Sequence, residues 1–202
     1  DQIIFRIIRQ RRACEEQPMD LLQMLMEARD DKTGEPLSDH ELRNEAMTMF
    51  IAGHETTANA LSWLWGILSQ QTGIRANLER EVDSVLGKKI PKASDYSSLS
   101  YCLKVFKETM RLYPPVPMLP RRVEKDHKLG GYHIEGGSDL FFSPYLMHRH
   151  PDFWGNPELF DPHRFDKETL REQHSYAYIP FGGGPRVCLG NNFALMEAVF
   201  II

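Results

Sequence analysis

An unbroken helical pattern of roughly 32 residues fills the middle of the first half of this sequence. Ser38, followed three residues later by Glu41, has the spacing of a capping box, which marks the start of a helix. The stretch that follows, ELRNEAMTMFIAGHETTANALSWLWGILSQ, contains no proline and reaches Gln70. At a rise of about 1.5 Å per residue, such a helix spans on the order of 48 Å, enough to cross a whole domain. Its second half is apolar on nearly every side, so we expect the helix to be largely buried.

The other patterns predict more helices in the first half of the chain and short strands in the second. We expect helices at Asp20–Asp31, at Ile74–Gly87 with Gly87 as a C-cap, and at Leu99–Tyr113 before two prolines. From Met118 onward prolines and glycines dominate, with strand candidates in KLGGYHI and DLFFSPY. The sequence therefore predicts a mainly α fold with small β-sheets, of the α+β class.

Composition and charge narrow the kinds of partner. The 202 residues are 42% hydrophobic, enough for a globular domain with a real core. A formal net charge of −4 and a sequence pI of about 6.1 leave no basic stripe to follow a phosphate backbone, so we expect no nucleic-acid partner. The longest uncharged run, Thr56–Ile74, contains too many Thr, Asn, Ser and Gln residues to span a membrane, and it is expected to be a buried helix.

The cysteines indicate the redox compartment of the protein, and the two ends of the sequence suggest a fragment. Cys14, Cys102 and Cys188 are scattered without CxxC spacing, which indicates neither a disulfide framework nor a zinc knuckle. A reducing, cytoplasmic compartment is therefore expected. The sequence starts at Asp1 without a methionine and stops at Ile202 inside an apolar run. We expect residues 1–202 to be a fragment, with any membrane anchor or further segment outside it.

Cys188 lies in a specialised loop, YIPFGGGPRVCLGNNFALME, that turns directly into a helical pattern. A helix N-terminus favours the thiolate form of a nearby cysteine, and the thiolate is the form that binds metal. The loop has four glycines, so its backbone can lie flat against a large planar group: Gly182, Gly183, Gly184 and Gly190. Arg186 supplies a cation whose planar fork suits a carboxylate. A planar group with carboxylates and a metal that needs one soft axial ligand is haem.

These residues resemble the cytochrome P450 family of haem-thiolate monooxygenases. The family's haem loop follows the pattern Phe, two residues, Gly, one, Arg, one, Cys, one, Gly, which is filled here by Phe181, Gly184, Arg186, Cys188 and Gly190. From average residue usage, a chance match has a probability on the order of 10⁻⁵ to 10⁻⁴. A buried structural cysteine in a Gly-rich turn would not need the Phe and the Arg at these offsets. A phosphate-binding loop fits poorly, because neither GxGxxG nor GK[ST] is present.

A second motif, AGHETTA at residues 52–58, lies in the long helix and matches the family's motif on the oxygen-binding side of haem. Ala52, Thr56 and Ala60 share one helix face with Gly53 beside them, so a groove is expected there. A glycine followed by hydroxyl residues also favours a local bulge in the helix. The resemblance implies that Glu55 and Thr56 relay protons. Taken alone, these two residues would be read as a solvated acid and a packing residue.

A third motif, Glu108 and Arg111 in KETMRLYPP, resembles the family's ExxR pair, and Arg164 in FDPHRF matches its third member. Roughly one ExxR is expected by chance in a chain of this size, and Glu168 with Arg171 forms another. The setting before LYPP favours the first pair. If these three residues form a buried triad, their role is to clasp the loop that holds Cys188, and removing one partner would cost on the order of 3–5 kcal/mol.

The connector PPVPMLPRRVEKD carries the family's arginine for a haem propionate, and the offset to Asp126 favours Arg121 over Arg122. Val116, Met118 and Leu119 would then border the substrate, although a packed Pro-rich connector is the alternative. His148 and His150 lack carboxylate or cysteine partners nearby in sequence, so they are expected to be surface residues without a role.

Taken together, the resemblance implies that residues 1–202 form the C-terminal part of a single cytochrome P450 domain. It implies haem b (iron protoporphyrin IX) with Cys188 as the axial thiolate ligand. The activity implied is a monooxygenase that inserts one atom of dioxygen into an apolar organic substrate, with electrons from a reductase or a ferredoxin-like protein. Two alternatives stay open. One is a peroxide-driven peroxygenase, which would tend to lack Glu55 and Thr56; the other is a haem-binding sensor or inactive scaffold of the same fold.

Overall fold

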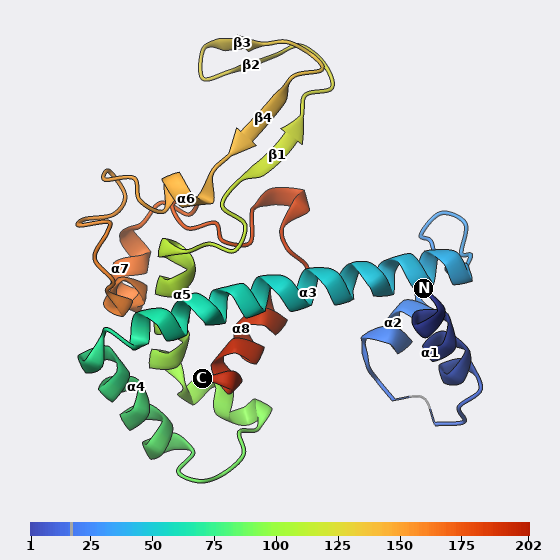
Figure 1. The fold of residues 1–202 in the computed structure, drawn as a ribbon. Helices are drawn as coiled ribbons and strands as arrows, with labels where there is room; N and C mark the ends of the chain where they lie inside the picture. Colours follow the sequence, from blue (N-terminus) through green and yellow to red (C-terminus); the bar gives the residue numbers. More distant parts are fainter. Residues whose placement is uncertain (17) are drawn as a thin grey trace. The chain divides into compact units, whose positions relative to one another are not determined.

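A computed structural model describes residues 1–16 and 18–202 (Figure 1). The chain divides into two compact units, Asp1–Glu55 and Thr56–Ile202. The boundary between them falls inside the longest helix, α3 (Asp39–Leu68).

The first unit contains α1 (Gln2–Arg12), α2 (Leu21–Glu27) and the start of α3. The predicted capping box is confirmed, because the Glu41 N–H donates to Ser38 Oγ at 3.3 Å and the Ser38 N–H donates to Glu41 Oε2 at 2.9 Å. Asp20 caps α2 through the N–H of Gln23 at 3.0 Å. The Asp20 carboxylate also accepts two bonds from the Arg11 guanidinium at 2.7 and 2.6 Å, which lower the pKa of Asp20 to about 2.

The α3 helix has the predicted length but not the predicted burial. In the second unit it packs through one stripe at i, i+3 and i+4 spacing: Thr57, Ala60, Leu61, Leu64 and Leu68. Trp63 and Trp65, on its other sides, remain 51% and 47% exposed. The expectation of a largely buried helix was wrong for this chain, because the elements present in the second unit cover α3 on one side only.

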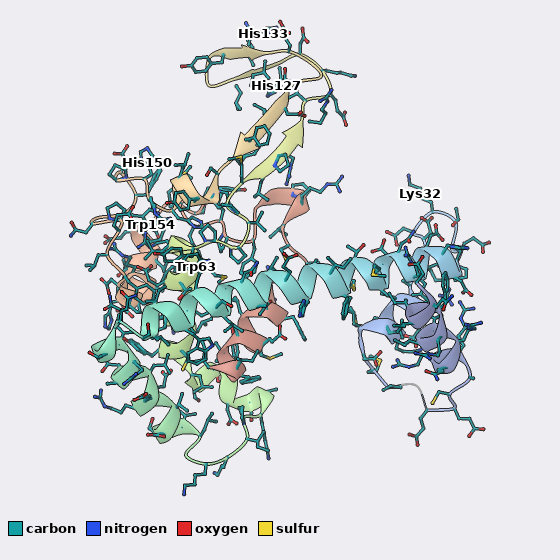
Figure 2. All side chains as sticks on the ribbon, viewed as in Figure 1. Lys32, Trp63, His127, His133, His150 and Trp154 are labelled. Atoms are coloured by element: carbon teal, nitrogen blue, oxygen red, sulfur yellow. The ribbon has the colours of Figure 1, made fainter. Side chains whose placement is uncertain are left out.

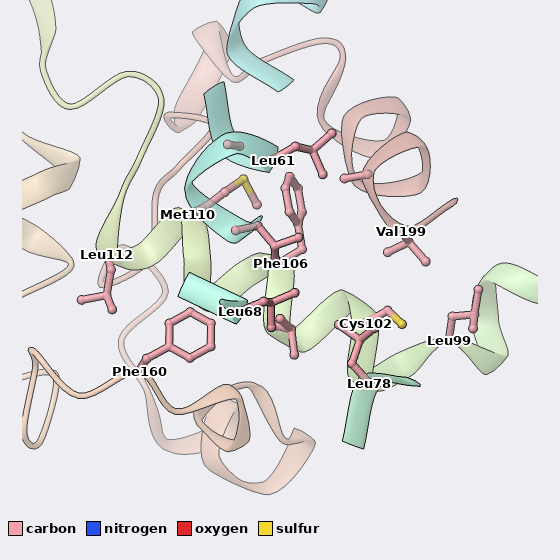
Figure 3. Packing of buried hydrophobic residues seen from close by; sticks show 14 residues of the cluster. Leu61, Leu68, Leu78, Leu99, Cys102, Phe106, Met110, Leu112, Phe160 and Val199 are labelled. Atoms are coloured by element: carbon pink, nitrogen blue, oxygen red, sulfur yellow. The ribbon is translucent and has the colours of Figure 1, made fainter. Parts of the chain in front are cut away.

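The core of the second unit is built around α5 (Ser100–Leu112), which contacts α4 (Thr72–Val85) and α8 (Asn191–Ile201). Eight residues of α5 are buried, more than on any other helix of this unit. Figure 3 shows side chains from four helices meeting in one cluster, among them Leu61 of α3, Leu78 of α4, Phe106 of α5 and Val199 of α8. Because α5 is enclosed by its neighbours, it is the fixed element against which loops of the second unit can be held.

The start of α5 depends on a residue from another helix. The Glu81 carboxylate, on α4, accepts the backbone N–H groups of Tyr101 and Cys102, both at 2.8 Å. These are two of the N–H groups that a helix leaves unpaired in its first turn, so Glu81 acts as the N-terminal cap of α5. Burial beside this carboxylate raises the pKa of Cys102 to about 12, which fits a structural, unreactive thiol. α5 ends at Leu112, one residue before the predicted end at Tyr113 and two residues before Pro114.

Two small antiparallel sheets follow, and the strand candidates predicted three of their four strands. β1 (Leu119–Arg122) pairs with β4 (Asp139–Phe142), and β2 (His127–Leu129) pairs with β3 (Tyr132–Ile134). Gly130 and Gly131 join β2 to β3 with φ angles of +57° and +87°, the conformation of a tight hairpin turn. Figure 1 shows the β2–β3 hairpin continuing outward from the β1–β4 pair. Helices with these sheets confirm the predicted α+β class.

After β4 the chain runs mostly through loops and single turns. The short helices in this region are α6 (Pro144–Met147), η2 (Pro162–Phe165), α7 (Lys167–Glu172) and η3 (Gly184–Arg186). A second small core of Trp154, Phe165 and Ala177, with Tyr178 against it, holds this region together. In the described part of the chain, no helix combines the length and the apolar character needed to cross a bilayer.

Candidate functional site

The loop before α8 is closed by hydrogen bonds of its own backbone. The Cys188 N–H donates to the carbonyl of Phe181 at 2.9 Å, and the Val187 N–H donates to the carbonyl of Gly184 at 3.1 Å. Phe181 packs against the main core, while Cys188 is exposed. The loop therefore has one end anchored in the core and presents the thiol at the surface, just before the first turn of α8.

The backbone conformation of this loop favours glycine at two positions. Gly182 and Gly184 have φ angles of +72° and +68°, in the left-handed region that other residues rarely adopt. Gly190, with φ −84°, has no such requirement, but a Cβ built there would lie 4.0 Å from Cys188 Sγ. Gly182 and Gly184 thus shape the turn, whereas Gly190 keeps a side chain away from the sulfur.

The surface around Cys188 has the properties that a haem needs. Val187, Leu189 and Phe193 are exposed to 49%, 84% and 65%, which leaves apolar side chains uncovered on both sides of the thiol. Arg186 is also exposed, two residues from the sulfur. The sulfur is a soft ligand for a metal, the apolar neighbours suit a planar apolar group, and the cation suits a carboxylate on that group. The residues present therefore fit haem.

The two arginines of β1 have different partners. Arg122 lies across from Asp139 on β4 and pairs with its carboxylate at 3.2 Å. Arg121 donates to the carbonyl of Pro120 at 2.8 Å, and within residues 1–16 and 18–202 no ion pair involves it. Among the described residues, Arg121 is thus the arginine of β1 whose charge no carboxylate neutralises.

Glu108, Arg111 and Arg164 come together in the structure. The Arg111 Nε and one terminal nitrogen donate to the two oxygens of Glu108 at 2.6 and 2.8 Å, and both side chains are completely buried. Arg164 Nε lies 3.4 Å from Glu108 Oε1. Burial raises the pKa of Glu108, and the two arginines act against that rise, so the carboxylate is held in place by charge.

This buried group also binds the loop that follows α6. Arg111 donates to the carbonyls of His148, Pro157 and Leu159 at 2.8, 2.7 and 3.1 Å. The N–H of Asp161 donates to Glu108 Oε1 at 2.9 Å. Arg111 therefore uses its guanidinium both for a bidentate ion pair and for three backbone acceptors, which fixes the path of residues 148–161 against α5.

The expectation that His148 lies at the surface without a role was wrong. His148 has no exposed surface. His150, which is labelled in Figure 2, is exposed. The His148 ring bonds the carbonyl of Arg111 and the N–H of Ile179, two groups 68 positions apart in the sequence. No sequence signal for this role was found, because both partners are backbone groups, whose position only the fold defines. Figure 2 shows two further histidines, His127 and His133, on the β2–β3 hairpin.

The AGHETTA motif lies in a regular part of α3. The helix remains α-helical from Asp39 to Leu68 without a π turn, so the expected bulge is not seen. A glycine permits a bulge but does not require one, since an α-helix can keep its i→i−4 bonds through it. A Cβ built on Gly53 would meet nothing within 4 Å, so the space beside this glycine is open. Glu55 and Ala52 are exposed and Thr56 is half-buried.

Comparison with known proteins agrees with this geometry. The cytochrome P450 family matches residues 1–202. Cyclooctatin synthase of Streptomyces melanosporofaciens is 39% identical over 100% of this chain and 44% of its own length. Cytochrome P450 4V2 of Homo sapiens is 39% identical over 90% of this chain and 35% of its own length.

Solved structures give the same result. The crystal structure of the cytochrome P450DA haem domain has a TM-score of 0.92 and 35% identity, over 100% of this chain and 45% of that one. A retinoic acid-bound cyanobacterial relative has a TM-score of 0.90 and 33% identity, over 98% of this chain and 46% of that one. The chain belongs to the cytochrome P450 family, whose members are haem monooxygenases. It spans less than half the length of these relatives.

Proposed function

We propose that this chain is the C-terminal part of a single cytochrome P450 domain and that the whole protein is a haem-dependent monooxygenase. The observation that carries the proposal is the loop before α8, which presents the Cys188 thiol among exposed apolar side chains beside Arg186. The backbone bond from Cys188 to Phe181 and the packing of Phe181 in the core support a fixed position for this thiol.

Haem b is the group that these residues would hold. Cys188 would supply the axial thiolate, and Arg186 and Arg121 would each face a propionate. Phe181, Gly182 and Gly190 would shape the surface next to the ring, and Ala52 and Gly53 would leave room on the oxygen side. Glu108, Arg111 and Arg164 would act on the fold rather than on the chemistry, by fixing the backbone around the loop.

When bound, haem with a thiolate ligand supplies oxygen activation, because electron density from the sulfur favours cleavage of the O–O bond. The chain's own residues would manage the protons. The Thr56 hydroxyl would hold a proton close to the oxygen and the Glu55 carboxylate would replace it from water. One oxygen atom would enter an apolar substrate and the other would leave as water. A reductase or ferredoxin-like partner would supply the two electrons.

The test uses the full-length protein with a surrogate electron donor, oxygen and a panel of apolar substrates. We expect Thr56→Ala to release a larger share of the consumed oxygen as hydrogen peroxide, because proton delivery fails. Thr72→Ala, at the start of α4, is the matched control. A peroxide share that stays the same in Thr56→Ala would refute the relay. Product formation as fast with hydrogen peroxide alone as with reductant and oxygen would refute the monooxygenase.

A further inference from the structure

His148 joins two segments that are far apart in the sequence. Its Nδ1 lies 3.2 Å from the carbonyl oxygen of Arg111, near the end of α5, and its Nε2 accepts the N–H of Ile179 at 2.8 Å. In return, the Arg111 guanidinium donates to the carbonyl of His148 at 2.8 Å. The ring is completely buried and lies 5.1 Å from the ring of Tyr178. His148 is thus bonded through both its side chain and its backbone.

These partners select one form of the ring. Because a backbone N–H faces Nε2, this nitrogen must carry a lone pair, and the hydrogen lies on Nδ1, where it faces a carbonyl. The charged groups nearby are Arg111 and Glu108 on α5 and Arg149 next in the chain. Burial, together with the two positive charges, lowers the pKa of His148 to about 4. The ring therefore stays neutral at physiological pH, and a proton added to Nε2 would point directly at another donor.

The bond to Ile179 lies at the start of the loop of Cys188, before its glycines. The carbonyl of Ile179 accepts the N–H of Gly182 at 3.0 Å, and the carbonyl of Phe181 accepts the N–H of Cys188 at 2.9 Å. Tyr178, one residue earlier, donates its hydroxyl to the carbonyl of Lys107 on α5 at 2.9 Å. The first two residues of the loop are therefore tied to α5, one of them through His148.

We propose that His148 is a positioning residue, whose neutral ring ties Ile179 to α5 and so sets the backbone position of Cys188. The consequence for ligation rests on the proposed function, because it requires Cys188 to hold haem. The anchoring itself does not, and it can be measured on the backbone.

The experiment compares full-length wild type with His148→Phe, His148→Gln and the control His150→Phe. Phenylalanine fills the space without a polar atom, glutamine keeps an acceptor and a donor, and His150 is exposed. The first measurement is hydrogen–deuterium exchange of the amides in residues 178–189, with the amides of α4 as a reference for global opening. The second is the share of haem that shows a thiolate-ligated band in the reduced, carbon-monoxide difference spectrum.

We expect amide exchange in residues 178–189 of His148→Phe to rise about tenfold beyond any rise in α4, because a buried hydrogen bond is lost. The thiolate-ligated share should fall in the same variant. His148→Gln should restore most of both signals, and His150→Phe should leave both unchanged. Equal exchange in the Phe and Gln variants, or wild-type exchange in His148→Phe, would overturn the proposal.

A second comparison covers the case in which His148→Phe fails to fold. His148→Asn, whose shorter amide reaches one of the two backbone groups, is then set against His148→Gln. Faster exchange in the Asn variant supports the anchor, and equal exchange overturns it. A wild type without a thiolate-ligated band would refute the proposed function, while the exchange data would still decide on His148.

Discussion

The loop of Cys188 is exposed and is closed by backbone bonds between residues a few positions apart, such as Cys188 to Phe181. The Glu108–Arg111 pair is completely buried, and its bonds reach backbone groups as far away as Asp161. The Cys188 loop exposes a thiol of the kind that binds metals. The Glu108–Arg111 pair forms charge-assisted hydrogen bonds that fix the surrounding backbone. The exposed thiol and the buried charges that fix the backbone therefore belong to different residues.

Removing Arg111 should give the largest loss of stability. Arg111→Leu leaves the Glu108 carboxylate buried without its main partner, and we expect the free energy of unfolding to fall by about 3–5 kcal/mol. Chemical denaturation of the full-length protein measures this loss. The control is Arg171→Leu, in the second ExxR, where both residues are exposed and a change within about 0.5 kcal/mol is expected. Equal losses in the two variants would show that burial does not distinguish the pairs.

A pH dependence should follow from His148. Its pKa of about 4 in the folded state lies below the usual value of 6.5, because burial disfavours the charged ring. The neutral ring thus contributes stability that is complete above pH ~6.5 and is lost as the pH falls toward 4. The expected slope is about 1.4 kcal/mol per pH unit in that window.

The slope is measured as the difference between wild type and His148→Gln in denaturation series from pH 7 to pH 4.5. Taking this difference cancels the titration of the acidic residues, which both proteins share. Parallel curves across the window would contradict a buried, neutral His148.

A smaller loss of stability is expected when the hydrogen bond between Tyr178 and α5 is removed. Tyr178→Phe removes the hydroxyl that bonds the carbonyl of Lys107 and keeps the ring against Phe165. We expect a loss of about 0.5–1.5 kcal/mol in the free energy of unfolding. Tyr132→Phe, on the exposed β3 strand, is the matched control and should show no loss. A loss as large as that of Arg111→Leu would mean that the hydroxyl, rather than the ion pair, dominates the clasp.

The smallest change in stability is expected on β1. Arg122→Ala breaks an exposed ion pair with Asp139, which contributes about 0–1 kcal/mol. Arg121→Ala should leave stability unchanged but weaken haem retention, since we propose that Arg121 faces a propionate. Transfer of haem to an excess of apomyoglobin measures retention for both variants. Faster transfer from Arg122→Ala than from Arg121→Ala would reverse the assignment.

Local sequence signals predicted several helix ends to within about two residues, although the helix expected at Asp20–Asp31 ends at Glu27. The box at Ser38 and Glu41, the glycine at Gly87 with φ +59° and the prolines after Leu112 all act within a few residues of the position they specify. β1 was not predicted, because its sequence LPRR has little strand character and forms a strand through pairing with β4.

The candidate site likewise has features that short-range sequence spacing predicts and features that depend on distant contacts. The spacing of Phe181, Arg186 and Cys188 is local and could be read directly, whereas the role of His148 depends on Arg111, 37 positions away, and on Ile179, 31 positions away. The contacts of Glu108 with Arg111 and Arg164 were predicted from the resemblance, and the structure shows them. The expectation of a bulge at Gly53 was wrong, because a glycine followed by hydroxyl residues permits a bulge but does not require one.

The central claim is that Cys188 is the axial ligand of a haem. The most direct measurement is the reduced, carbon-monoxide difference spectrum of the full-length protein beside its Cys188→Ala variant. We expect a strongly red-shifted Soret band in the wild type that disappears in the variant, because only the thiolate is removed. A band that survives in Cys188→Ala, or that is absent from both proteins, would contradict it.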